Sequence, residues 1–136
     1  MDVEDAVNFA RANHRAVLAT FRKDGSPQLT PVTVGADGSG AITVSSREPA
    51  AKVLNLRRDP RAWVCIFTDQ FFGDYVQVEG SADIVELPDA MDGLVEYYRS
   101  VSGEHPDWED YRAAMVRDKR VLIRISVTRA GPTYSG

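Results

Sequence analysis

The sequence predicts a mainly β domain, a small antiparallel β-barrel with short helices, and three observations support this prediction. First, the chain has 136 residues, and a domain commonly has about 100–200 residues, so residues 1–136 are expected to form a single domain. Second, short runs of apolar and β-branched residues alternate with turns that contain glycine. Third, these runs follow one another in hairpin-like order, and a barrel closes such strands without leaving exposed edges.

The expected elements cover most of the chain. In chain order they are a helix over 3–12, strands over 16–21, 29–34 and 41–45, a helix over 49–58, strands over 62–67 and 75–85, helices over 88–101 and 107–118, and a closing strand over 121–127. This pattern contains six strands. Residues 129–136 are expected to form a mobile tail.

Turn and cap signals set the boundaries in the first third of the chain. Asp2 is a suitable N-cap, and apolar residues then follow helical spacing. Gly25 and residues 37–40 mark two turns, because glycine tolerates the positive φ that such turns need. Pro31 interrupts the second strand, and proline cannot donate a hydrogen bond to a β-ladder. This strand is therefore expected at a sheet edge or at a bulge.

The middle of the chain switches from helical to strand composition. Pro49 suits the first turn of a helix, and Pro60 ends it. Residues 62–67 form a continuous apolar run, which is typical of a strand that is covered on both faces. Cys65 lies in this run and is expected to be buried and inert. The long strand that follows is expected to bend at Gly80.

Composition excludes several classes of protein. The net charge of −4 disfavours general binding to nucleic acids or to anionic membranes. A single cysteine excludes an internal disulfide. No apolar stretch reaches the roughly 18 residues of a membrane-spanning helix, and the chain starts with acidic residues. Neither a membrane span nor a signal peptide is therefore expected, and the cytoplasm is the default location.

Conventional catalytic motifs are absent from the sequence. It contains no glycine-rich phosphate loop and no GxSxG elbow. His14 and His105 have no ligand-spaced partner, so packing roles are favoured over catalysis, and no metal site is expected. No catalytic residue is identified. If the chain is an enzyme, a cofactor must carry the reaction.

The segment over residues 45–61 carries the clearest chemical signal. A strand that ends with Ser45 and Ser46 leads into a helix start, with Lys52 one turn into the helix. Hydroxyl groups, free backbone amides and a lysine can together bind an anion. The alternative is a capping serine followed by solvated charges on an amphipathic helix. The residues alone leave both interpretations open.

Several segments, taken in order, resemble one known family. They are GSPQ at 25–28, the segment 45–52, NLRRDPR at 55–61, VEGSA at 78–82, GEHPDW at 103–108 and YRAAMV at 111–116. Their order and spacing over residues 6–127 resemble the pyridoxamine 5′-phosphate oxidase-like split-barrel superfamily. The resemblance is greatest to a small actinobacterial branch that uses the deazaflavin coenzyme F420 in place of FMN.

This resemblance implies a homodimer of six-stranded, FMN-binding-like split barrels, with the cofactor in a groove at the dimer interface. It also implies which residues bind the cofactor. The candidates are Gln28, Thr30 and Pro31 along the ring, Ser45, Ser46, Arg47 and Lys52 at the phosphate, Arg57 with Arg58 as further phosphate candidates, and Gln77 from the other subunit.

The implied function is an F420-dependent oxidoreductase, expected to be a reductase, that transfers a hydride between F420 and an unidentified small molecule. Oxidation of pyridoxine phosphate is not expected, because the chain lacks the C-terminal extension of the true oxidases. Two alternatives stay open: an FMN-dependent oxidase or flavin reductase, and a non-catalytic protein that binds a flavin, F420 or haem. The loop over 68–74, with Phe71 and Phe72, is expected either to border the substrate pocket or to pack across the dimer.

Overall fold

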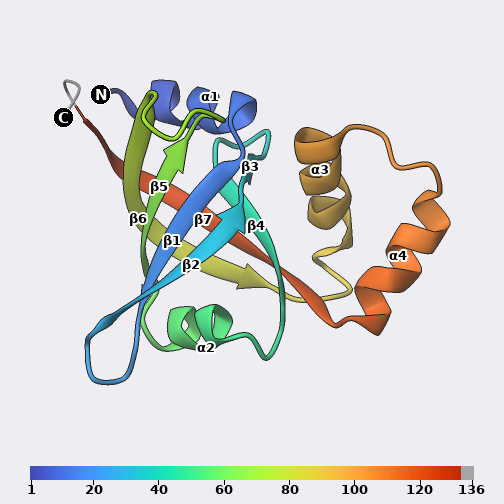
Figure 1. Ribbon diagram of the computed structural model, residues 1–136. Helices are drawn as coiled ribbons and strands as arrows, with labels where there is room; N and C mark the ends of the chain where they lie inside the picture. Colours follow the sequence, from blue (N-terminus) through green and yellow to red (C-terminus); the bar gives the residue numbers. More distant parts are fainter. Residues whose placement is uncertain (133–136) are drawn as a thin grey trace.

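The computed structural model describes residues 1–132, which form four helices and seven strands (Figure 1). The elements are α1 (Val3–Ala12), β1 (Arg15–Phe21), β2 (Pro27–Thr33), β3 (Gly35–Ala36), β4 (Ile42–Arg47), α2 (Ala51–Arg58), β5 (Arg61–Phe67), β6 (Tyr75–Val85), α3 (Met91–Ser102), α4 (Trp108–Arg117) and β7 (Arg120–Gly131). Among these residues, no helix is both long and apolar enough to cross a membrane.

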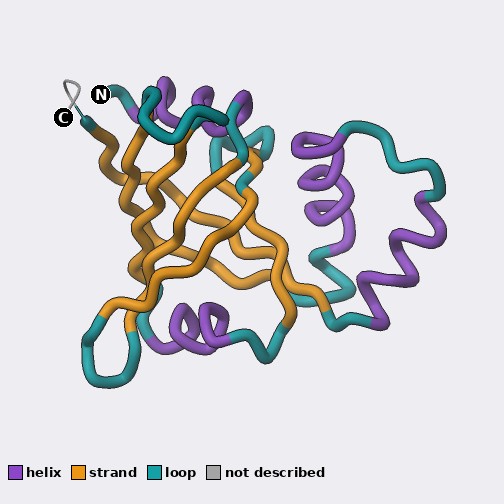
Figure 2. Tube along the Cα trace, in the orientation of Figure 1, coloured by secondary structure: helices purple, strands orange, loops and turns teal. Residues whose placement is uncertain are grey.

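The strands form one antiparallel sheet in the order β2-β1-β5-β6-β7-β4-β3. Only Val34 separates the end of β2 from the start of β3, so the two outermost strands of the sheet are consecutive in the chain. The sheet must therefore curl around, and β2 comes close to β4. Figure 2 shows the curled sheet with the helices around it. This is the mainly β split barrel that the sequence predicts.

Inward-facing aliphatic side chains fill the barrel. The strands contribute the fully buried residues Leu18, Ile42, Val44, Val64, Ile66, Val76, Val78, Ile123 and Ile125. Helix α1 closes one end with Ala6 and Ala10, and α2 closes the opposite end with Val53 and Leu56 (Figure 1). Burial of this apolar surface stabilises the barrel by about 25 cal/mol per Å² removed from water.

Helices α3 and α4 lie beside the barrel and form a second, partly aromatic cluster (Figure 1). Leu94 and Leu122 are buried in this cluster together with Tyr111, whose hydroxyl donates a 2.7 Å hydrogen bond to the Leu94 carbonyl. The ring of Tyr98 packs edge-on against the rings of Trp108 and Tyr111. Helix α3 also packs against β3 and β4, so it forms a wall next to the place where the barrel opens.

Three local expectations are confirmed. Gly25 has a φ of 86° in the β1–β2 turn. Strand β2, which contains Pro31, lies at a sheet edge and pairs with β1 alone among the described strands. The β6–β7 register shifts between Glu79 and Gly80. A Cβ atom on Gly80 would overlap the Ser126 carbonyl oxygen, so the bend requires glycine at this position.

Two expectations about strand number and chain end are wrong. The structure has seven strands rather than six, because Gly35–Ala36 pairs with β4 as a separate two-residue strand. The closing strand does not stop at residue 127. Residues 129–131 continue β7 and pair with β6, so this part of the expected tail is ordered. Residues 133–136 lie outside the described residues.

Within one chain, residues 62–67 are covered fully on one face only, so cover for both faces is not provided by this chain itself. Burial alternates along β5: Val64 and its inward-facing neighbours are buried, whereas Trp63, Cys65 and Phe67 are half-buried on the outward face. Cys65 is therefore only partly buried, which corrects the second expectation for this strand. Burial still raises the pKa of the Cys65 thiol, which disfavours the reactive thiolate.

Candidate cofactor groove

A groove of about 360 Å³ lies where the barrel opens between β2 and β4. Its lining comes from four elements that are distant in the sequence, namely β2, β4, α2 and α3. The lining residues are Pro31, Val32, Thr33, Val44, Ser45, Lys52 and Tyr97. Three predicted cofactor-binding residues, Pro31, Ser45 and Lys52, are therefore brought together by the fold.

Lys52 carries a positive charge that has no counterion in the described chain. Burial lowers its pKa first, and the nearby charge of Arg120 lowers it further. Among residues 1–132, neither Lys52 nor Arg120 forms a salt bridge with a carboxylate. Two partly buried cations without a counterion create a positive potential, and this potential favours a bound anion.

The first turn of α2 adds uncapped backbone amides to this region. Its N-cap is Ala50, and no side chain caps the helix there. The interpretation of this segment as a capping serine is therefore wrong. Ser46 is buried, and its hydroxyl donates to the Arg47 carbonyl at 3.2 Å. Uncapped amides at a helix N-terminus attract negative charge, and the positive charge of Lys52 does the same.

Tyr97 forms the α3 wall of the groove. Its hydroxyl donates a 2.9 Å hydrogen bond to the Thr33 carbonyl, which ties α3 to the edge strand β2. Burial raises the pKa of Tyr97, although the backbone of Ser45 and the charge of Arg120 act in the opposite direction. The hydroxyl therefore keeps its proton near neutral pH, and Tyr97 positions the wall.

The buried polar atoms that lack a partner also gather on this side of the barrel. In the described part of the chain they are Thr43 Oγ1, Ser100 Oγ and Arg120 Nε. Thr43 and Ser100 face each other across Gly35, where an added Cβ would lie 3.2 Å and 2.5 Å from their oxygens. Buried polar groups are usually paired, so these three atoms are exceptions among the described residues.

A hydrogen-bonded polar cluster around Asn55, one turn along α2 from Lys52, contains two of the predicted residues. Asn55 is buried and donates hydrogen bonds to Thr20 Oγ1 at 3.1 Å and to Gln28 Oε1 at 2.9 Å. Arg58 donates to the Asn55 side chain at 3.3 Å and to the Phe21 carbonyl at 3.0 Å. Gln28 and Arg58 thus fasten α2 to the β1–β2 hairpin, and neither lines the groove.

The structure does not bring the remaining predicted residues into the groove lining. Thr30 lies on the inward face of β2, because it pairs with the fully buried Leu18. Arg47 is exposed at the end of β4. Arg57 pairs with Glu86 at 2.7 Å, so its charge is already compensated.

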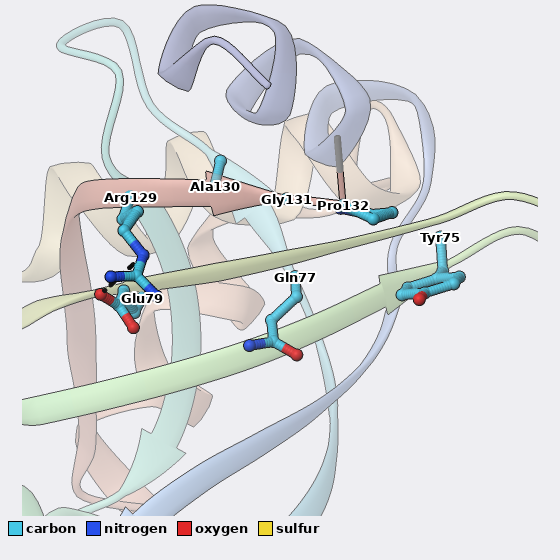
Figure 3. A pocket seen from close by; sticks show the side chains of 7 residues that line it. All are labelled: Tyr75, Gln77, Glu79, Arg129, Ala130, Gly131 and Pro132. Carbon is cyan, nitrogen blue, oxygen red and sulfur yellow. Dashed lines mark ion pairs between the residues drawn. The ribbon is translucent and has the colours of Figure 1, made fainter. Parts of the chain in front are cut away.

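Gln77 lies in a second hollow, of about 300 Å³, on the outward face of the sheet. Figure 3 shows Gln77 on β6 between Tyr75 and Glu79, with β7 above them. Glu79 pairs with Arg129 at 3.4 Å at one end of the hollow. This hollow shares no lining residue with the groove, so one chain alone does not place Gln77 beside Lys52.

Neither histidine lies in these two sites. The Nδ1 atom of His14 is 2.8 Å from the Val34 carbonyl oxygen. The Nδ1 atom of His105 accepts a 2.9 Å hydrogen bond from the Asp107 amide. Among the described residues, no group of three or more His, Cys, Asp or Glu side chains is placed to hold a metal ion.

Sequence reasoning missed Tyr97 and Arg120. Tyr97 reaches the groove only because α3 folds back against β4, and Arg120 opens β7 directly opposite Arg47. Neither residue belongs to a motif with recognisable spacing. The strand period offered one usable signal: Gln28 and Thr30 point to the opposite face of β2 from Pro31, so the three were not expected to share one surface.

Comparison with known proteins agrees with this architecture. The family model described as pyridoxamine 5′-phosphate oxidase matches residues 3–134. A conserved hypothetical protein from Mycobacterium tuberculosis is 29% identical over 96% of this chain and 82% of its own length, with a TM-score of 0.77.

Two further solved structures share the fold and have different names. One, named F420 reductase, is 22% identical over 91% of this chain and 94% of its own, with a TM-score of 0.68. The other, a heme binding protein from Mycobacterium smegmatis, is 23% identical over 94% of this chain and 52% of its own, with a TM-score of 0.70. At this identity they show the fold alone.

Proposed function

The chain belongs to the pyridoxamine 5′-phosphate oxidase family, and from this premise we propose that it is an F420-dependent oxidoreductase, acting as a reductase on a small molecule. The family includes oxidoreductases, and its fold binds flavin-type cofactors. One observation carries the proposal: the groove at the barrel opening holds Lys52, a partly buried cation with no salt bridge within residues 1–132, beside the uncapped first turn of α2. A related fold named F420 reductase supports the choice of cofactor.

The residues in the groove fit a flavin-like cofactor with an anionic end. Lys52 and the uncapped first turn of α2 would bind the phosphate, because a charged amine and backbone amides both donate to phosphate oxygens. Ser45 lies on the same wall and offers a hydroxyl donor. Pro31 and the apolar atoms of Val32 would contact the ring.

The protein's own contribution would be binding, orientation and exclusion of water. When bound, F420 supplies hydride transfer to an electron-poor double bond. The groove walls would hold the ring beside the substrate, and such positioning accelerates the reaction through proximity. The Tyr97 hydroxyl donates its proton in a hydrogen bond to the Thr33 carbonyl, so it is not assigned as the proton donor of the reaction. The proton that completes the reduction would therefore come from solvent.

The proposal includes a homodimer, because the outward face of the sheet is too apolar to stay in water. Trp63, Cys65 and Phe67 are half-buried on this face, and Leu29 on the neighbouring edge is 67% exposed. A second copy that covered this face would also cover the hollow with Gln77, and so extend the groove of its partner. Obligate interfaces commonly bury more than about 2,000 Å² in total. Sedimentation as a 15 kDa monomer at micromolar concentration would contradict the dimer.

The loop between β5 and β6 belongs to the same proposed interface. Phe71 is 78% exposed and Phe72 is 97% exposed, and their rings pack edge-on at 5.0 Å. Phe71 also contacts Phe67, so the loop continues the apolar face of the sheet. Packing across the dimer therefore has more support than a role at the substrate pocket.

FMN is the alternative cofactor, because the groove offers phosphate donors that FMN could also use. F420 has the longer and more acidic tail, and the positive potential around Lys52 favours it. Both cofactors should be titrated against the apo-protein, with binding followed by fluorescence, and turnover should then be assayed with reduced F420.

Each outcome of this experiment separates the candidates. Tighter binding of F420, together with turnover, supports the proposal. Preference for FMN, or equal affinity, favours an FMN-dependent oxidase or flavin reductase. Tight binding without turnover on any electron-poor substrate favours a non-catalytic carrier.

A further inference from the structure

We infer that Gly35 is a positioning residue for the groove: it lets α3 lie directly against β3, and α3 then holds Tyr97 as a fixed wall of the groove. This inference rests on the proposed function, because it concerns the groove that would bind the cofactor. It explains what sets the width of that groove, and it assigns a role to a residue that does not line it.

Gly35 lies in β3 at the point where α3 packs against the sheet. It is buried and pairs with Thr43 of β4. A Cβ atom added to Gly35 would lie 2.5 Å from Ser100 Oγ, 3.2 Å from Thr43 Oγ1 and 3.4 Å from Tyr97 Cδ2. Ser100 and Tyr97 both belong to α3. Gly35 does not have a positive φ, so the close approach of the helix, and not the backbone conformation, requires glycine here.

Two hydrogen bonds attach α3 to the chain on either side of this contact. The Tyr97 hydroxyl donates to the Thr33 carbonyl at 2.9 Å, at the end of β2. The Gly38 amide donates to Glu96 Oε1 at 3.1 Å, just after β3. Residues 33–38 connect the two outermost strands of the sheet, and Figure 1 shows α3 alongside β3 and β4. The helix is therefore attached to the segment at which the barrel is split.

The position of α3 sets the width of the groove. Thr33 and Tyr97 both line it, so the hydrogen bond between them lies in the groove wall. A displaced α3 would strain this bond and move the Tyr97 ring away from any ligand in the groove. A gap of about 0.5–1 Å removes roughly a quarter to a half of the van der Waals contact energy. A small shift of the helix is therefore sufficient to weaken binding.

The hydroxyl groups beside Gly35 provide a way to test this contact. Thr43 Oγ1 and Ser100 Oγ are buried and have no hydrogen-bond partner within residues 1–132. An unpaired buried hydroxyl costs stability, so its removal from Ser100 should not harm the fold. Ser100→Ala also removes the atom that a Cβ at position 35 would overlap most. It is therefore a compensating substitution for Gly35→Ala.

The experiment is a double-substitution cycle with a matched control. The proteins are the wild type, Gly35→Ala, Ser100→Ala and the double variant. Gly38→Ala is the control, because Gly38 also faces α3 but its added Cβ would lie 3.8 Å from Glu96 Oε1, which is an ordinary contact. Affinities for F420 and FMN are measured by fluorescence at a temperature at which circular dichroism shows each variant folded.

We expect Gly35→Ala to weaken the binding of both cofactors roughly ten-fold, because the added methyl group pushes α3 and Tyr97 outward. Turnover with reduced F420 should fall further, since a displacement of about 1 Å can reduce a rate by about 100-fold. Ser100→Ala and Gly38→Ala should stay within about two-fold of wild type. The double variant should recover most of the lost affinity.

A purely structural role for Gly35 would lower stability and leave the affinity of the folded protein unchanged. Wild-type affinity in folded Gly35→Ala therefore overturns the inference. Weaker binding that Ser100→Ala does not restore overturns it as well, because the loss then does not come from the contact with α3.

If Gly35→Ala does not fold, Ser100→Val tests the same contact from the helix side. This variant keeps Gly35 and adds bulk to α3, so it should also weaken the binding of F420 and FMN. Wild-type affinity in folded Ser100→Val overturns the inference. If the wild type binds neither F420 nor FMN, the proposed function itself fails.

Discussion

Two neighbouring polar residues of helix α2 have opposite surroundings. Asn55 is buried, and its amide nitrogen donates to both Thr20 and Gln28. Lys52 lines a groove, and it has no carboxylate partner within residues 1–132. Less than one helical turn separates the two residues.

The difference shows which polar cluster maintains the fold and which is available for a ligand. A buried network with every member paired stabilises one arrangement of the backbone. A cluster of unpaired cations lowers stability in the apo-protein and gains its counterion only on binding. The sequence of α2 suggests a single anion site. In the structure, Asn55 instead maintains the fold, and Lys52 remains available to bind a ligand.

Replacement of Lys52 should have the largest effect on the binding side. Lys52→Ala removes one charge-assisted contact to the cofactor anion, so we expect a loss of about 1.5–3 kcal/mol in affinity, roughly ten- to hundred-fold. Apo stability should stay within about 0.5 kcal/mol of wild type. A titration with F420 and a denaturant melt measure the two quantities.

Lys23→Ala is the control for general loss of charge, because Lys23 is exposed in the turn between β1 and β2. It should bind F420 as the wild type does. If the Lys52 and Lys23 variants bind equally well, Lys52 does not contact the anion, and the contrast between Lys52 as a binding residue and Asn55 as a structural residue is lost.

Replacement of Asn55 tests the structural side. Asn55→Ala leaves Thr20 without its side-chain donor in a buried position, and Gln28 loses a partner as well. We expect the free energy of unfolding to fall by about 1–3 kcal/mol. Urea unfolding followed by circular dichroism measures this change. A variant as stable as wild type would show that the network is dispensable.

Alkaline pH should weaken the binding side gradually. Burial and then Arg120 lower the pKa of Lys52 below its ordinary 10.5. A lysine binds an anion only while protonated, so the contribution is present below the folded-state pKa and is lost as pH rises through it. The FMN-to-riboflavin affinity ratio should therefore decline before pH 10.5. In Lys52→Arg the ratio should stay constant over this range, because arginine keeps its proton.

The smallest effect is expected at Arg57, which belongs to the same helix but already has a carboxylate partner. Arg57→Ala breaks an exposed ion pair with Glu86. Such pairs contribute about 0–1 kcal/mol to stability, and F420 affinity should stay close to wild type. A ten-fold loss of affinity would place Arg57 in the anion site, as the family resemblance implies, and would remove the distinction between paired and unpaired cations.

Local chemistry determined most of the secondary structure. The helix over residues 3–12 has the predicted bounds, and the bend at Gly80 was placed correctly. Caps, turn glycines and strand periodicity depend on nearest neighbours, so they can be inferred from sequence. Pro31 indicated an edge strand for the same reason, because a missing N–H excludes a central position.

Only the tertiary structure decided which residues form the groove. Lys52, Ser45 and Pro31 were expected there, but Tyr97 reaches it because α3 folds back against β4. Gln28 and Arg57 have residue types suited to a cofactor, yet each bonds to a neighbour within the chain. Whether a polar side chain is paired depends on contacts between distant segments. The sequence by itself therefore determined the barrel and the basic helix, and the packing of the elements decided which charges stay free for a ligand.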